Sequence, residues 1–254
     1  PKSGFPVVSA QGVLAVDLLS GISLYEKNAD SPLLPASTTK IITALVALDN
    51  YPLDMTIKVG NVRVDGQKMG LKFGEEMKVE DLLYGLLVYS ANDAAEVLAL
   101  NFPGGRENFI AAMNKKAGEL SLNHSKFYNP SGLDGLGHVS TARDLVRVSE
   151  VAMRNSEFSK IVGTKDIVVK SVDNRILHRL TNINVLLGTV PGVLGVKTGW
   201  TENARENLVT YIERDGHKVF IAILGSQDRF GETKELIDWI FDNYNWQSVT
   251  LPSN

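Results

Sequence analysis

The sequence predicts an α+β fold, in which one antiparallel sheet is assembled from both ends of the chain and flanked by helices, with a mostly helical insert. Strand-like runs with turn residues between them lie near each end, at residues 13–18 and 22–26 and at residues 208–213 and 218–225. In the middle of the chain, apolar residues instead recur every three or four positions, as in a helix. Strands remote in sequence therefore have to meet in one sheet.

The composition is that of an ordinary globular protein. Of the 254 residues, 44% are hydrophobic and 22% are charged, which is enough to bury a full core. No internal repeat or low-complexity linker divides the chain. We therefore expect a single domain over residues 1–254, with a sheet lobe formed by residues 1–53 and 190–254 and a helical lobe formed by residues 54–189.

Charge and cysteine content exclude several partners. The net charge of −3, without any basic run interleaved with aromatic residues, gives no attraction to nucleic acid. The chain has no cysteine, which excludes disulfides and thiolate metal sites. His124, His178 and His217 are scattered without metal-ligand spacing, so we expect no metal and no cofactor.

The strands are predicted from the turn residues between them. The first two form a hairpin across Ser20-Gly21, and the last two form another across Asp215-Gly216. Residues 165–196 are weakly patterned, with strand-like patches at residues 167–169 and 193–196. These patches are expected to be short strands.

The helices are predicted from the periodicity of apolar residues and from residues that begin or end helices. Tyr51-Pro52 ends the first helix, and the turn-rich residues 53–78 are expected to form short strands or loops. Periodic stripes place helices at residues 37–50, at 79–87 and onward through Leu100, at 109–120, from a cap at Ser140 or Thr141 through Ala152, and at 236–244.

A hydroxyl and an amine stand one turn apart at the start of the first helix. Pro35 cannot continue a preceding helix, so the helix begins near Ser37. Residues three apart share a helix face, with roughly 5–6 Å between Cβ atoms, so Lys40 can reach the Ser37 hydroxyl. A neutral Lys40 could take the serine proton if burial or a second cation lowers its pKa. Ser-x-x-Lys alone also occurs by chance in chains of this length.

Two more polar signatures follow. Ser90-x-Asn92 lies at a helix junction, and Lys197-Thr198-Gly199 lies on a strand that leads into the second hairpin. With Ser37-x-x-Lys40, and in this order, they resemble the three signature elements of active-site-serine penicillin-binding proteins and β-lactamases. Longer motifs, at residues 35–40, 129–134, 137–142 and 182–184, are similar to those of the serine D-alanyl-D-alanine carboxypeptidases, and this resemblance covers about residues 8–245.

The resemblance implies a β-lactamase/transpeptidase-like fold and a low-molecular-mass penicillin-binding catalytic domain. It implies a serine hydrolase that removes the C-terminal D-alanine from peptidoglycan stem peptides through a Ser37 acyl-enzyme, which β-lactam antibiotics also form. Since peptidoglycan lies outside the cytoplasm, we expect an extracytoplasmic protein of the bacterial cell envelope. Many relatives continue into a β-rich domain and an amphipathic anchor, so membrane contact is expected only through segments absent from this chain.

The resemblance also implies roles for individual residues. Ser37 is the nucleophile and Lys40 its base, while the backbone N–H groups of Ser37 and Trp200 form the oxyanion hole. Lys197 is a second cation that is expected to depress the pKa of Lys40 and to attract the carboxylate of the substrate. Ser90 relays a proton to the departing amine.

The remaining predicted contacts are with the substrate. Asn92 has a donor and an acceptor suited to the peptide backbone of the substrate. Thr198 and Gly199 belong to the strand beside the substrate, with Thr198 donating to the terminal carboxylate. Arg229 is a candidate for the same carboxylate, although an arginine at the end of a strand is often simply solvated.

Other polar residues have simpler explanations. His138 could form a Ser-His-Asp triad with Asp134, but in a glycine-rich loop a loop-fixing hydrogen bond is the alternative that we favour. The pairs Glu75-Glu76 and Glu80-Asp81 are expected to be solvated faces and charges at a helix N-terminus rather than an acid/base pair.

One departure from the family pattern lies beside the site, and two alternative functions stay open. Ala204 is followed by Arg205 where relatives usually have glycine, and this affects strand packing beside the site. A class A-like β-lactamase, the nearest alternative, deacylates with a glutamate in a Glu-x-x-Asn element, and this chain contains none. A non-catalytic penicillin-binding or cell-wall-binding module is the other alternative, against which the intact Lys40, Ser90 and Lys197 argue.

Overall fold

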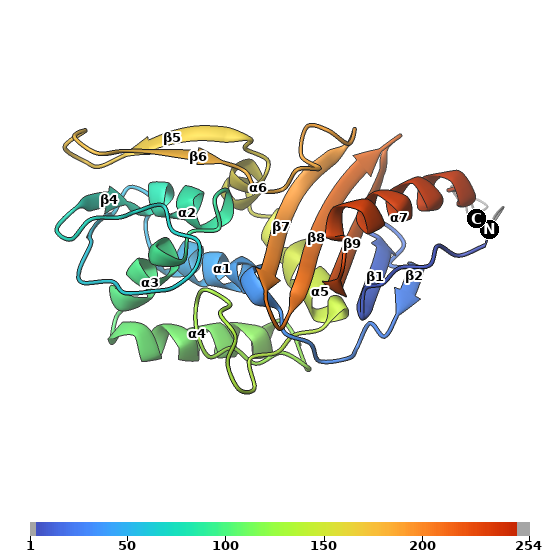
Figure 1. The fold of residues 1–254 in the computed structure, drawn as a ribbon, viewed down its shortest axis with the longest axis horizontal. Helices are drawn as coiled ribbons and strands as arrows, with labels where there is room; N and C mark the ends of the chain where they lie inside the picture. The colour runs from blue at the N-terminus through green and yellow to red at the C-terminus, as the bar shows by residue number, and fades with distance from the viewer. Residues whose placement is uncertain (1–3, 248–254) are drawn as a thin grey trace, which may run out of the picture.

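A computed structural model, which describes residues 4–247, has a five-stranded sheet with helices on both faces (Figure 1). The strand order is β2-β1-β9-β8-β7, and every neighbouring pair is antiparallel. The predicted sheet, with strands from both ends of the chain, is confirmed. Its strands are β1 (Gly12–Asp17), β2 (Ser23–Lys27), β7 (Val193–Thr201), β8 (Arg205–Arg214) and β9 (His217–Ser226).

Turn chemistry accounts for the two predicted hairpins. Asp215 and Gly216 join β8 to β9 with φ angles of 53° and 78°, the pair of left-handed residues that a two-residue hairpin turn requires. Gly21, with φ 70°, turns the chain between β1 and β2. The hairpin signals in the sequence therefore identified the strand pairing correctly.

Helices cover the sheet and fill the rest of the molecule (Figure 1). In the figure α7 crosses the front of the sheet, where it contacts β8 and β9, and α5 lies behind it against β1 and β9. The Thr141 side chain caps α5 by accepting from the Asp144 N–H, as predicted. The helices are α1 (Lys40–Asn50), α2 (Val79–Leu87), α3 (Asn92–Leu100), α4 (Gly105–Glu119), α5 (Ala142–Met153), α6 (Ser156–Val162) and α7 (Arg229–Asn243), and a 3₁₀ turn, η1 (Ala36–Thr39), precedes α1.

The sequence missed α6 and β6, while the predicted patch at residues 167–169 became β5. In β6, His178 and Leu180 are buried while Leu177 points outward, so a polar residue replaces an apolar one on the inner face. Two small hairpins lie beside the helices: β3 (Thr56–Lys58) with β4 (Glu76–Lys78), and β5 (Asp166–Lys170) with β6 (Leu177–Thr181).

The arrangement of the helices bears on the predicted lobes. α1 falls within the predicted sheet lobe but packs against α2, α4 and α5. The division into lobes at residues 53 and 190 stays a prediction, and the ends of the predicted domain, residues 1–3 and 248–254, lie outside the described residues. Among residues 4–247, no helix is long and apolar enough to cross a membrane.

Candidate active site

A tight turn places Ser37 at the entrance to α1. Ala36 has a left-handed φ of 47°, and η1 begins there and leads directly into α1 at Lys40. The Ser37 hydroxyl lies 2.9 Å from the Lys40 Nζ. The predicted one-turn spacing of hydroxyl and amine is therefore present, in a half-buried serine that lines a groove.

Lys40 is fully buried and has three oxygen neighbours. Its Nζ lies 2.7 Å from the Asn92 Oδ1 and 2.6 Å from the backbone oxygen of Ser131, in addition to the Ser37 Oγ. Burial lowers the pKa of Lys40 to about 7, although the nearby carboxylates of Asp93 and Glu96 act in the opposite direction. A substantial fraction of Lys40 is therefore neutral at physiological pH.

These contacts orient the lone pair of the neutral amine. The oxygens of Asn92 and Ser131 are carbonyl oxygens, which can only accept hydrogen bonds. They engage both hydrogens of a neutral Lys40 amine, and the lone pair then faces the Ser37 hydroxyl, which can donate as well as accept. The geometry suits transfer of the Ser37 proton to Lys40.

Asn129 holds the loop that carries the Ser131 carbonyl. Its Oδ1 accepts from the backbone N–H groups of Ser131, Gly132 and Leu133, at 3.2, 2.7 and 3.1 Å, and its Nδ2 donates to the Leu133 oxygen. One side chain thus fixes a segment without regular structure, and with it one acceptor of the Lys40 amine.

A second lysine lies behind Ser90. The Lys197 Nζ is buried and donates to the Ser90 Oγ at 2.8 Å and to the Thr198 backbone oxygen at 3.0 Å. Burial, with help from Lys40 and Arg229, holds the pKa of Lys197 well below its usual value. The sequence led us to expect that Lys197 would depress the pKa of Lys40, whereas burial is the cause there.

Two glycines allow the surrounding backbone to approach Ser37 closely. A Cβ atom on Gly132 would lie 1.9 Å from the Ala36 oxygen, and one on Gly199 would lie 3.1 Å from the Ser37 nitrogen. Gly132 also has a left-handed φ of 85°. A Cβ at Gly132 would therefore force the 129–134 loop away from the turn before Ser37, and one at Gly199 would push β7 and this turn apart by a few tenths of an ångström.

The groove in front of Ser37 has a volume of about 890 Å³. The Thr198 Oγ1 and the Arg229 Nε are buried there without a hydrogen-bond partner in the described part of the chain. Arg229 begins α7 and also donates to the Gly199 oxygen at 2.8 Å. The Trp200 side chain lines the groove and is 61% exposed. The predicted residues that line the groove are Ser37, Ser90, Asn92, Thr198, Gly199, Trp200 and Arg229, while Lys40 and Lys197 lie behind it.

The amide of Asn92 is engaged on both sides. Its Oδ1 accepts from Lys40, and its Nδ2 donates to the Asp65 backbone oxygen at 2.7 Å. The neighbouring Asp93 carboxylate accepts backbone N–H bonds from residues 69–71. Both side chains fasten the segment of residues 65–71 beside Ser37, and the substrate contact expected of Asn92 stays a prediction.

His138 does not form a triad. Its Nε2 lies 2.9 Å from the Thr39 Oγ1, and its Nδ1 accepts the Tyr128 N–H at 3.1 Å, which fixes the loop as the favoured alternative predicted. The carboxylate of Asp134 instead accepts from Thr201 and Asn203. Burial lowers the pKa of His138 to about 4, so the imidazole is neutral at physiological pH.

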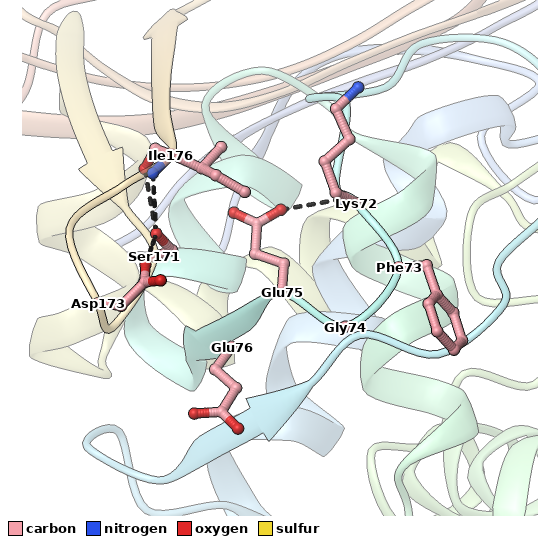
Figure 2. Close-up of a pocket in the computed structure, with 8 residues that line it drawn as sticks. All are labelled: Lys72, Phe73, Gly74, Glu75, Glu76, Ser171, Asp173 and Ile176. Carbon is pink, nitrogen blue, oxygen red and sulfur yellow. Dashed lines mark hydrogen bonds between the residues drawn. The ribbon is translucent and has the colours of Figure 1, made fainter.

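A second, smaller hollow of about 260 Å³ lies between residues 72–76 and the β5–β6 turn. Figure 2 shows the Glu75 carboxylate in this hollow, where it accepts the Lys72 N–H at 2.8 Å. Its other oxygen lies 2.7 Å from the Nε2 of His178. The expectation that Glu75 lies on a solvated face is wrong, because this ion-pair geometry buries its side chain completely and ties the β5–β6 hairpin to residues 72–76.

Several groove residues carried no sequence signal that singled them out. Asp65, Gly66 and Gln67 line the groove from a loop, and Ile183 and Leu133 add apolar surface. Of these, Leu133 and Ile183 lay within motifs used for the family resemblance, but neither was singled out. In residues 4–247, no group of three histidine, cysteine or carboxylate side chains could hold a metal ion.

Comparisons with known proteins agree with this geometry. The family model described as D-alanyl-D-alanine carboxypeptidase matches residues 2–228. The carboxypeptidase DacF of Bacillus subtilis is 33% identical over 92% of this chain, and DacB2 of Mycobacterium tuberculosis is 36% identical over 95%. The chain spans 63% of the length of the first relative and 86% of the second.

A solved structure extends the likeness to the fold. The DD-transpeptidase of a Streptomyces species superposes with a TM-score of 0.89 at 31% identity, covering 94% of this chain and all of the other. This confirms the predicted β-lactamase/transpeptidase-like fold. The chain therefore belongs to the D-alanyl-D-alanine carboxypeptidase family of serine-type carboxypeptidases, as its three signatures predicted.

Proposed function

We propose that this protein removes the C-terminal D-alanine from peptidoglycan stem peptides through an acyl-enzyme at Ser37, and that β-lactams acylate the same serine. Proteins of this family act on peptidoglycan in the cell envelope, and we propose an extracytoplasmic location for this one. The observation that carries the proposal is the triple contact of the buried Lys40 amine, which aims its lone pair at Ser37.

In the proposed acylation, the Ser37 Oγ attacks the carbonyl carbon between the two D-alanines while its proton passes to Lys40. The N–H groups of Ser37 and Trp200 hold the oxygen that becomes negative. Support comes from Ser37 lying in the first turn of a helix, where N–H groups have no intrahelical acceptor, and from the close approach of β7 that Gly199 permits.

The leaving D-alanine needs a proton on its amine. Ser90 lines the groove and accepts from Lys197, so in this proposal its hydroxyl passes a proton to the departing nitrogen and regains one from the buried pair of lysines. The unpartnered Thr198 Oγ1 and Arg229 Nε are suited to the terminal carboxylate of the substrate. Water then hydrolyses the Ser37 ester and releases the shortened peptide.

The test uses purified protein, a diacetyl-lysyl-D-alanyl-D-alanine peptide and a penicillin. We expect release of D-alanine and, by mass spectrometry over time, a long-lived penicilloyl adduct on the intact protein. Ser37→Ala removes the nucleophile and abolishes both, with circular dichroism as the control for folding. Release of D-alanine by Ser37→Ala would refute the mechanism. Turnover of the penicillin without a lasting adduct would instead favour the β-lactamase alternative.

A further inference from the structure

A buried carboxylate that the proposed acylation does not use lies next to Asn92. Asp93 is the second residue of α3, and it is only 5% exposed. Its oxygens accept the backbone N–H groups of residues 69–71, at 2.9–3.0 Å, and that of Ala94 at 3.0 Å. Within residues 4–247, Asp93 forms no ion pair. Its negative charge is therefore held by neutral donors alone.

The other buried carboxylate of α3 has a cation in direct contact. Glu96 lies one turn further along the helix, and Arg106 donates to both of its oxygens, at 2.7 and 3.2 Å. A guanidinium at this distance offsets much of the field that the carboxylate exerts on more distant groups. Asp93 has no such partner, so its charge acts on its surroundings with less compensation.

The charge of Asp93 acts on the Lys40 amine. The Lys40 Nζ lies 2.7 Å from the Oδ1 of Asn92, the residue next to Asp93. All three residues are buried, so water and salt screen little between them. Burial lowers the pKa of Lys40 to about 7, while Asp93 and, to a smaller extent, Glu96 act against burial. Asp93 thus favours the protonated form of the amine.

The remaining charged groups of the site are positive or paired. They are Lys197 in β7, Arg229 at the start of α7, and the ion pair of Glu96 with Arg106. His138, which contacts the neighbouring Thr39, is neutral at physiological pH, and the Ser131 contact is a carbonyl. Among the described residues whose charge acts on Lys40, Asp93 is therefore the anion without a cation partner.

We propose that Asp93 is a positioning residue that acts through Lys40: its carboxylate fastens residues 69–71 to the start of α3, and its negative charge strengthens the Lys40 amine as a base. This inference rests on the proposed function, in which Lys40 takes the Ser37 proton. A general base works best when its pKa lies near the working pH, and burial without Asp93 would take the pKa of Lys40 lower.

The experiment measures the rate constant for labelling by a fluorescent penicillin from about pH 5 to 9. Asp93→Asn removes the charge, so the midpoint of the pH profile should move by about one unit toward lower pH. Its amide has a single acceptor oxygen and leaves part of the 69–71 N–H groups unpaired, so the limiting rate at high pH should also fall. Asp93→Glu keeps the charge and should keep the wild-type midpoint, with a lower limiting rate.

Asp144→Asn is the matched control. Asp144 is also a buried carboxylate in the first turn of a helix, where it accepts the His124 N–H at 2.9 Å and the Ser125 hydroxyl at 2.8 Å. It is not among the groups whose charge acts on Lys40. This variant should unfold at a lower temperature but keep the wild-type midpoint. Asp93→Ser, which also lacks the charge, takes the place of Asp93→Asn if that variant does not fold.

The possible outcomes separate this inference from the proposed function. A midpoint of Asp93→Asn at the wild-type value or at higher pH would overturn the inference alone, whatever the limiting rate. Failure of both neutral variants to fold would also overturn it, because the carboxylate would then serve the fold rather than the base. No labelling of the wild type and no release of D-alanine would overturn the proposed activity, and the inference with it.

Discussion

The Lys40 Nζ lies 2.7 Å from the Asn92 Oδ1, a contact between residues 52 positions apart in the chain. Together with the Ser131 carbonyl, it holds the amine so that its neutral form presents its lone pair to Ser37. The protonated amine has no lone pair to offer. In the proposed mechanism, the protonation state of this one buried side chain therefore decides whether Ser37 can lose its proton.

Acylation is expected to depend on pH with a midpoint near 7, because burial lowers the pKa of Lys40 to about 7. The rate constant for labelling by a fluorescent penicillin should rise about tenfold per pH unit below the midpoint and level off above it. His138→Gln serves as the control, since a neutral loop histidine should not move the midpoint. A labelling rate that does not change between pH 5.5 and 8 would contradict the assignment of Lys40 as base.

Gly132→Ala is expected to reduce acylation by more than about 100-fold, because a misplacement of about 1 Å at a nucleophile has costs of this size. The new Cβ would lie 1.9 Å from the Ala36 backbone oxygen and would have to displace the turn that carries Ser37. Penicillin labelling measures the loss, with thermal unfolding recorded alongside.

Gly135→Ala is the matched control in the same loop. A Cβ there meets nothing closer than 3.9 Å, so labelling should stay at the wild-type rate. Equal labelling by the two variants would mean that the contact between Gly132 and Ala36 does not position Ser37.

Arg205→Gly is expected to stabilise the protein. Arg205 adopts a left-handed φ of 60° at the start of β8, where relatives usually have glycine. A side chain in that conformation costs about 1–2 kcal/mol, and the extra freedom of glycine in the unfolded chain offsets part of the gain. We expect the free energy of unfolding in urea to rise by about 0.5–1 kcal/mol. Arg205→Ala keeps the strained backbone and should give no such increase.

His138 should make the fold sensitive to acid. Its pKa is about 4 in the folded protein against 6.5 for a free histidine, so the unfolded chain binds a proton that the folded chain does not between these limits. The stabilisation is complete above pH 6.5 and declines as the pH falls toward 4, by roughly 2–3 kcal/mol at pH 4.5. Urea unfolding of the wild type and of His138→Gln at pH 7 and pH 4.5 should give a smaller decline for the variant.

The sequence predicted those parts of the fold whose cause is local. Asp215-Gly216 determined a hairpin by its backbone preference, and the apolar stripe of α2 determined a helix by its period. β6 was missed because its inward residues, His178 and Leu180, mix polar with apolar. The burial of His178 depends on its contacts with Glu75 and the Met69 oxygen, which lie more than 100 residues away.

The site was predictable to a similar degree. Side chains in short signatures, such as Ser37 and Lys40, can be found from spacing once several signatures occur together and in the same order. The Ser131 carbonyl cannot, because a backbone oxygen has no sequence pattern, and its position depends on the many bonds of Asn129. The carboxylates of Asp65 and Glu202 come from two different loops, which only the folded chain brings to one groove.

The reactivity of Ser37 is expected to depend on three separate segments of the folded chain, because all three contact the Lys40 amine. Its three neighbours come from the turn before α1, from the start of α3 and from an irregular loop, so the amine is correctly held only when all three are in place. Local unfolding of any one of these segments should therefore stop the acylation of Ser37 before the whole molecule unfolds. Fluorescent penicillin uptake during refolding would therefore report the arrival of the last of these segments, and should lag behind the recovery of helical circular dichroism.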